Sequence, residues 1–244
     1  MSVAEKMIVL ADSVRSLTGT SELLSLDEMA SQINERMSQD SSFYAGETTS
    51  FCNPYITSIR DRVFRALTWL TAIDCPNVKT VGEYAFQYCQ GLTGINLPAC
   101  ESLADGAFYD IGEVTRIELP SLISTKPSAF RANPTLETVY LPKLEILATS
   151  AFNGCTALKS IELPSLTNLG SSVFEGCDSL EYIVLGGDSV VSMSGFLFAG
   201  TQVGASFKAA YVKDELVEQY KVATNWSYLA DYITPKSEFM EETV

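Results

Sequence analysis

The chain has 244 residues, 46% of them hydrophobic, and a formal charge of −14 from 16 basic and 30 acidic side chains. This acidic balance argues against nucleic acid or an anionic lipid surface as a partner, because phosphates attract clustered Lys and Arg. The sequence contains no histidine, which removes the usual general base of a Ser or Cys nucleophile.

The two ends of the sequence carry expectations about targeting. Residues 1–7 lack the basic and apolar regions of a signal peptide, and no anchoring segment follows the last acidic residues. No apolar run reaches the length of a membrane-spanning helix. We therefore expect synthesis in a cytoplasm, no membrane insertion and no export by the general route.

Residues 1–37 are expected to form a helical hairpin. Apolar side chains over residues 3–17 step by four and three, Gly19 lies where a helix C-cap is expected, and Ser25 opens a capping box. Two interpretations stay open: a hairpin whose apolar stripes pack together, or a module for docking or oligomerisation. Residues 38–50 are polar and rich in Gly, Ser and Thr, which predicts a linker.

A phenylalanine returns every 22 residues through the middle of the chain, and a β-branched column and a proline column keep the same period. A period of about 20–29 residues with an L-x-x-L-x-L core is typical of leucine-rich repeats. Residues 51–205 are therefore predicted to form an α/β repeat solenoid of 22-residue coils with a parallel β-sheet on one face. The three columns are Phe64, Phe86, Phe108, Phe130, Phe152 and Phe174; Ile73, Ile95, Ile117, Val139, Ile161 and Ile183; and Pro54, Pro76, Pro98, Pro120, Pro142 and Pro164.

One coil shows how each repeat is expected to fold. Ile161 and Leu163 point inward from a strand and Glu162 points outward, because successive side chains of a strand alternate. Pro164 ends the strand, and Val173 and Phe174 are predicted to lie in a short helical or 3₁₀ turn on the return side. Stacked coils would then bring the phenylalanine rings into one buried column.

Three of the six cysteines share one repeat position, three residues after the phenylalanine: Cys89, Cys155 and Cys177. We interpret them as small buried hydrophobic residues. A disulfide between Cys155 and Cys177 of adjacent coils is the alternative. No His and no C-x-x-C pair is present, so we expect neither a metal site nor a cofactor.

Residues 206–236 are expected to cap the solenoid. Residues 210–212 predict a final strand, Asp214 is placed to begin a helix, and Trp226 would close the apolar end of the stack. The charged tail, residues 237–244, is predicted to be disordered.

Three segments resemble known proteins. Residues 81–89 (V-G-E-Y-A-F-Q-Y-C) and 151–158 (A-F-N-G-C-T-A-L), with the Ile-x-Leu-Pro strands, resemble the BspA-like, surface-type leucine-rich repeat family. That resemblance implies protein or glycan binding at a surface and supplies no catalytic residues. Residues 211–227 resemble the C-terminal cap of such proteins in gut Firmicutes and their phages, and residues 10–30 are similar to a helical module of tail-associated proteins of those phages.

The outward strand positions form the candidate binding site. Inward residues are uniform from coil to coil whereas outward residues vary, as expected for a binding face on a fixed scaffold. Tyr and Arg are enriched at interface hot spots, although Tyr is also common on ordinary sheet surfaces. The candidate binding residues are Arg116, Glu118, Tyr140, Glu162 and Tyr182.

The sequence is interpreted as that of a non-enzymatic binding or structural protein. It contains no nucleophile elbow, phosphate-binding loop or dinucleotide fingerprint. The first hypothesis is a phage virion component, tail-associated or host-recognising, that binds a host surface protein or glycan. Residues 1–37 would then contact other virion proteins or further copies of the chain. The alternatives are a bacterial cell-surface or secreted adhesin and a structural decoration protein.

Overall fold

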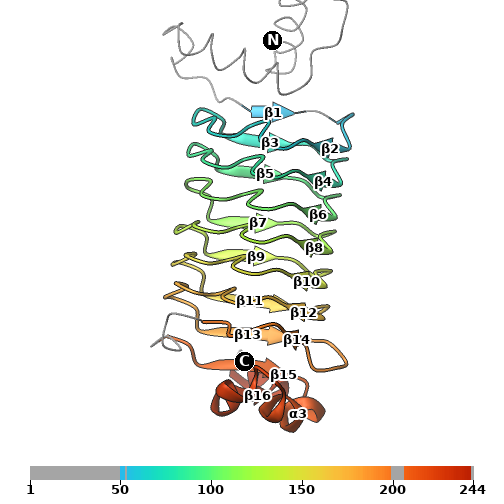
Figure 1. The fold of residues 1–244 in the computed structure, drawn as a ribbon, viewed down its shortest axis with the longest axis vertical. Helices are drawn as coiled ribbons and strands as arrows, with labels where there is room; N and C mark the ends of the chain where they lie inside the picture. Colours follow the sequence, from blue (N-terminus) through green and yellow to red (C-terminus); the bar gives the residue numbers. More distant parts are fainter. Residues whose placement is uncertain (1–49, 53, 199–205, 243–244) are drawn as a thin grey trace, which may run out of the picture.

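The structure is a computed structural model that describes residues 50–52, 54–198 and 206–242. These residues wind into a parallel β-solenoid of about eight turns, stacked along the long axis of the molecule (Figure 1). The hairpin predicted over residues 1–37 lies outside the described residues. So does the predicted linker, except Ser50, which begins the first strand.

The longer strands lie side by side along one face of the solenoid (Figure 1). They pair in parallel, with a shift of one coil, in three groups of three, two and four strands, so that Ile73 faces Ile95 and Ile117 faces Val139. This arrangement confirms the predicted parallel sheet. The strands are β1 (Ser50–Cys52), β3 (Ala72–Asp74), β5 (Gly94–Asn96), β7 (Arg116–Glu118), β9 (Thr138–Tyr140), β11 (Ser160–Leu163), β13 (Tyr182–Leu185), β15 (Ala209–Val212) and β16 (Ile233–Pro235).

A second parallel ladder follows each longer strand, and the sequence did not predict it. Its seven strands pair in the order β14-β12-β10-β8-β6-β4-β2. Each has two residues, of which the second is buried, and two residues are too short to display an alternating pattern. The strands are β2 (Ser58–Ile59), β4 (Thr80–Val81), β6 (Ser102–Leu103), β8 (Ser124–Thr125), β10 (Ile146–Leu147), β12 (Asn168–Leu169) and β14 (Ser192–Met193).

The phenylalanine column forms a continuous buried stack, as predicted. From Phe64 to Phe174, neighbouring ring centroids lie 5.0 to 6.1 Å apart and the ring planes differ by 9° or less. Phe51 and Phe198 continue the stack at its two ends with tilted rings. The core of the solenoid is therefore one apolar column shared by all coils.

The backbone around each phenylalanine is a turn with two left-handed residues, so the predicted short helical turn was wrong. We call the five residues centred on each phenylalanine a corner. The residues two before and two after the phenylalanine have positive φ. They are Arg62, Tyr84, Gly106, Ser128, Ser150 and Ser172 on the first side, and Ala66, Tyr88, Asp110, Ala132, Gly154 and Gly176 on the second.

This conformation turns alternate backbone N–H groups of a corner toward the next coil. The N–H groups of Tyr84, Phe86 and Tyr88 donate to carbonyls of the following coil at 2.8, 2.9 and 3.1 Å. Buried backbone groups need such partners. The corners therefore add a third set of coil-to-coil hydrogen bonds beside the two strand ladders.

The cysteine column lies in the core, and all six cysteines of the chain are free thiols in the structure. The alternative Cys155–Cys177 disulfide is therefore not formed. The thiols of Cys89, Cys155 and Cys177 lie 2.9 to 3.2 Å from the carbonyl oxygen of the phenylalanine 25 residues earlier. Each cysteine thus fills the core and also donates a weak hydrogen bond between coils.

Asn133 occupies the cysteine position in one coil and is a buried polar side chain with all its groups paired. Its amide nitrogen donates to the carbonyls of Phe108 and Phe130, at 2.9 and 2.8 Å. Its amide oxygen accepts from the Ile111 N–H at 2.9 Å. The side chain therefore bonds to the previous coil at two points and to its own coil at one.

The C-terminal cap closes the last coil with side-chain hydrogen bonds as well as apolar packing. It consists of η2 (Asp214–Leu216), α3 (Val217–Val222) and η3 (Ser227–Tyr232). Trp226 is completely buried, which confirms its predicted place at the apolar end. The Val191 N–H donates to the Tyr220 hydroxyl at 2.9 Å, Trp226 Nε1 donates to the Val191 carbonyl at 2.8 Å, Asn225 Nδ2 donates to the Met193 carbonyl at 2.7 Å, and the Leu197 N–H donates to the Tyr228 hydroxyl at 2.8 Å.

Residues 237–242 of the segment predicted to be disordered are helical, and residues 243–244 lie outside the described residues. Residues Lys236–Glu242 form helix α4, beginning with a hydrogen bond from the Ser237 N–H to Asp214 Oδ1 at 3.1 Å. The ring of Phe239 packs against Tyr182 and Tyr211, with centroid distances of 5.1 and 4.9 Å. Packing of the Phe239 ring therefore holds helix α4 against the sheet, although the acidic composition of this segment had predicted a disordered tail.

Candidate binding surface

The outward residues of the longer strands form the surface that we call the strand face. Because the pleat alternates, Arg116 and Glu118 of β7 point outward while Ile117 is buried between them. The pairing of β7 with β9 sets Arg116 beside Thr138 and Glu118 beside Tyr140. Three of the five predicted residues therefore lie together on two adjacent strands.

Ion pairs join charged groups on this face and immediately before its strands, where Glu137, Lys159, Glu181 and Lys208 lie. The guanidinium of Arg116 contacts the carboxylate of Glu118 on the same strand. Lys159 Nζ lies 3.1 Å from Glu137 Oε2, and Lys208 Nζ lies 2.8 Å from Glu181 Oε2, so both pairs bridge adjacent coils. All these side chains are at least 45% exposed, and exposed pairs contribute only about 0–1 kcal/mol each.

Tyr140 and Glu162 of this face have exposed side chains that a partner could contact. Tyr140 is 53% exposed, a large value for an aromatic ring on a sheet. Glu162, one coil further along the same column, is exposed and has no ion pair within the part of the chain that the structure describes. An aromatic ring next to an uncommitted carboxylate offers both apolar contact and hydrogen-bond acceptors to a partner.

Tyr182, the fifth predicted residue, lies in a different environment. It is half-buried in an aromatic cluster, 6.1 Å from Tyr211 and 5.1 Å from Phe239 between ring centroids. Val184, two residues on, is buried in the same cluster. Helix α4 therefore lies over the outer surface of the sheet at this end, a cover that the strand pattern alone does not reveal.

The buried thiols offer little nucleophilic chemistry. Burial raises the pKa of the Cys89, Cys100 and Cys155 thiols to about 12, so they stay protonated at neutral pH. Residues 50–52, 54–198 and 206–242 contain no group of three or more Cys, Asp or Glu side chains placed to hold a metal ion. Across these same residues, no helix has the length and apolarity needed to cross a bilayer.

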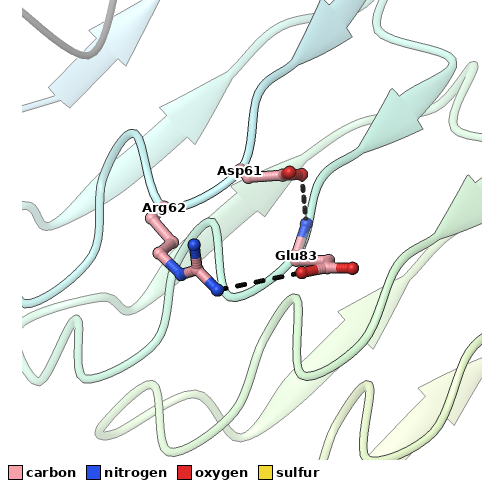
Figure 2. A network of polar contacts seen from close by, with 3 residues as sticks. All are labelled: Asp61, Arg62 and Glu83. Atoms are coloured by element: carbon pink, nitrogen blue, oxygen red, sulfur yellow. Dashed lines mark hydrogen bonds and ion pairs between the residues drawn. The ribbon is translucent and has the colours of Figure 1, made fainter.

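The corners form a second exposed surface, which lies apart from the five predicted binding residues. Asp61 Oδ1 accepts from the Glu83 N–H at 2.8 Å, and Arg62 lies 3.8 Å from the Glu83 carboxylate (Figure 2). The Arg62 guanidinium also lies 5.8 Å from the ring centre of Tyr84. A tyrosine at both left-handed positions of one coil was the sequence signal that could have drawn attention to this surface.

The aromatic contacts of this surface continue into the next two corners. The Tyr88 and Tyr109 rings meet edge to face at 5.8 Å, and the Arg131 guanidinium lies 5.9 Å from the Tyr109 ring centre. A Cβ at Gly106 would collide with the Tyr84 ring, so glycine there leaves room for that ring. The side chains of neighbouring corners are thus packed against one another along the outside of the stack.

The repeats match the model of a known protein family. Residues 38–144 and 124–209 match the family model described as the BspA type leucine-rich repeat region, in six copies. The chain belongs to the BspA-type leucine-rich repeat family. The matched family is a repeat scaffold rather than a catalytic domain.

One solved structure, with a TM-score above 0.5, supports the same fold, and two others are similar at lower scores. A leucine-rich repeat protein of T. pallidum (TpLRR) is 25% identical with a TM-score of 0.56, and the match covers 62% of this chain and 75% of that one. A leucine-rich repeat protein from Bacteroides ovatus ATCC 8483 is 22% identical with a TM-score of 0.37, covering 68% of this chain and 63% of that one. The pneumococcal vaccine antigen PcpA is 14% identical with a TM-score of 0.26, covering 80% of each chain.

No curated protein matches the chain. The resemblance of residues 10–30 to phage tail-associated proteins is not supported by these matches. The comparisons therefore establish the family and the fold of the repeats, and they leave the partner and the location of the protein to be proposed.

Proposed function

We propose that this BspA-type protein is a non-enzymatic binding protein whose strand face recognises a protein or glycan on a cell surface. The observation that carries the proposal is the exposed ring of Tyr140, with Glu118 and Glu162 in the same column and Arg116 on the adjacent strand. Tyr and Arg are the residue types that most often dominate binding energy.

The scaffold beneath these residues supports the proposal. Inward neighbours such as Ile117 and Ile161 are buried in the shared core, β7 is paired with β9, and β11 is paired with β13. A rigid support lowers the entropy lost on binding, because the contacting side chains are held in place beforehand. The Arg116–Glu118 contact further restricts the guanidinium.

The test is a double substitution on this face. We expect Tyr140→Ala with Arg116→Ala to weaken binding of labelled full-length protein to intact gut Firmicutes cells while leaving the Tm nearly unchanged, since both side chains are exposed. Lys79→Ala, which removes an exposed ion pair with Glu101 beside the short strands, is the matched control. Undiminished cell binding by the double variant would show that the strand face is not the recognition surface.

For the setting of this activity we propose a virion, with the bacterial cell surface as the alternative. The resemblance of residues 10–30 favours the virion, where residues 1–37 would contact other virion proteins or further copies. The BspA-type repeats are equally consistent with a surface protein. Peptides of this chain in purified virions would support the first setting, whereas their release by protease treatment of intact bacteria alone would support the second.

A further inference from the structure

Tyr84 and Tyr88 occupy backbone positions that suit neither of them. Their φ angles are 50° and 64°, in the left-handed region that bulky side chains disfavour. In the other coils the same two positions hold Ser, Gly, Ala or Asp, apart from Arg62. The fold thus does not require tyrosine at either position, and strain of this kind often accompanies function.

The corners differ in composition between the two halves of the stack. The corners centred on Phe64, Phe86, Phe108 and Phe130 carry all the Tyr and Arg residues of this surface. The corner centred on Phe152 has the sequence S-A-F-N-G, and the corner centred on Phe174 has the sequence S-V-F-E-G. Neither contains Tyr or Arg. The change occurs while the backbone conformation stays the same, so local folding does not explain it.

The cations of this surface are only partly neutralised. Arg65 and Arg131 are exposed and have no carboxylate partner among the residues that the structure describes. The Arg131 guanidinium is held against the Tyr109 ring, which leaves its N–H groups available at the ring edge. In a chain with a net charge of −14, a ridge with unpaired arginines is a local site for an anion.

We propose that these four corners bind an anionic polysaccharide, independently of the strand face. Tyrosine rings present flat apolar surfaces on which the C–H faces of sugars can stack, and Arg65 and Arg131 would receive acidic groups of the chain. The two arginines are three coils apart, a span of about 14 Å at the spacing of parallel strands, which suits an oligomer rather than a single sugar. One decorated corner per coil also matches a ligand with a regular repeat.

The key variant is Tyr88→Gly, tested in the full-length protein with a short oligogalacturonate as the probe. Glycine relieves the left-handed strain and is already the residue at this position in the coils of Phe152 and Phe174. We expect affinity measured by calorimetry to fall about tenfold, the scale of a hot-spot aromatic, while the Tm stays the same or rises. A tyrosine kept only for packing would give the reverse: a lower Tm and unchanged affinity.

Arg131→Gln provides a second variant that leaves every left-handed position untouched. We expect it to weaken binding and to reduce the loss of affinity with added salt, because one charge contact is removed. Lys143→Gln, which removes one exposed positive charge outside both the corners and the strand face, is the matched control and should bind the probe like the unaltered protein. A methyl-esterified probe tests the charge, and a glycerol-phosphate polymer distinguishes phosphate from carboxylate as the anionic group.

The proposal fails if neither anionic polymer binds the unaltered protein, or if the methyl-esterified probe binds as tightly as the charged one. It also fails if Tyr88→Gly and Arg131→Gln both retain full affinity. Loss of cell binding in the strand-face double variant with unchanged polysaccharide binding would separate this site from the proposed function.

Discussion

Asn133 and the cysteines of its column perform the same task with different chemistry. The cysteine thiols each donate one weak bond to a phenylalanine carbonyl of the previous coil. Asn133 makes that contact and two more, one of which accepts the Ile111 N–H. Asn133 thus supplies hydrogen-bond partners to two buried backbone groups, the Ile111 N–H and the Phe108 carbonyl.

This comparison leads to a prediction for Asn133. Replacing it with Leu keeps the number of non-hydrogen side-chain atoms and the branch at Cγ, but leaves the Ile111 N–H and the Phe108 carbonyl short of partners, which should destabilise the protein by about 3 kcal/mol. Asn133→Cys should cost less, because a thiol there can donate to Phe108 as Cys155 does to Phe130. Urea unfolding followed by circular dichroism measures both variants, and equal losses would contradict this account.

The cysteines themselves can be tested by their reactivity. Cys52 is exposed, whereas the other five are buried; the pKa is raised for every cysteine with a resolved shift, Cys52 included, so exposure is what distinguishes Cys52. Only thiolates react quickly, and a higher folded-state pKa means less thiolate at neutral pH. We expect maleimide at neutral pH to label Cys52 alone in the native protein and all six cysteines in urea, as read by mass spectrometry. Rapid native labelling of Cys89 or Cys155 would show that the stack opens locally.

At the scale of elements, the C-terminal cap covers the exposed edge that every solenoid has at its end. The last coil would otherwise expose unpaired backbone groups, which invite further strands. Tyr220, Trp226, Asn225 and Tyr228 supply partners for this edge from their side chains. Strand β16 follows as the last strand of the sheet, and its Pro235 has no N–H to offer.

The polar part of this cap should be measurable separately from its packing. Tyr220→Phe keeps the ring, which meets Trp226 edge to face at 5.0 Å, but removes the acceptor of the Val191 N–H. A buried N–H without a partner costs about 1–3 kcal/mol, so the unfolding midpoint should fall. Tyr140→Phe, at an exposed ring, is the control and should not change it. If the two variants unfold alike, the hydroxyl of Tyr220 is dispensable for the cap.

The sequence predicted those elements whose side chains repeat, and missed those defined by the backbone. The phenylalanine stack and the longer strands followed from apolar residues at fixed spacing, and the place of Trp226 followed from its position in the segment after the last repeat. The second ladder was missed because two-residue strands have no period. The left-handed corners were missed because Ser, Ala and Tyr, rather than only Gly, occupy them.

The candidate binding site on the strand face was also predictable only in part. Strand parity places Arg116, Glu118, Tyr140 and Glu162 outward, as the structure shows. The environment of Tyr182 depends on Phe239, which is 57 positions later and reaches it only through the cap and helix α4. Contacts made by a segment outside the repeat cannot be inferred from the repeat.

At the scale of the molecule, stability comes from contacts between neighbouring coils, so the cost of a substitution should depend on its place in the stack. Phe108 is completely buried between two parallel rings, 5.0 and 6.0 Å away. Phe108→Ala should therefore destabilise the protein by about 3–5 kcal/mol, because it leaves a cavity in the shared core. Phe196, which is 55% exposed, is the matched control, and its truncation should cost far less. Hydrogen exchange should show the loss of protection centred on the coils next to Phe108 and decreasing toward both ends. A uniform loss along the stack, or equal costs for the two phenylalanines, would mean that the coils do not act as nearest neighbours.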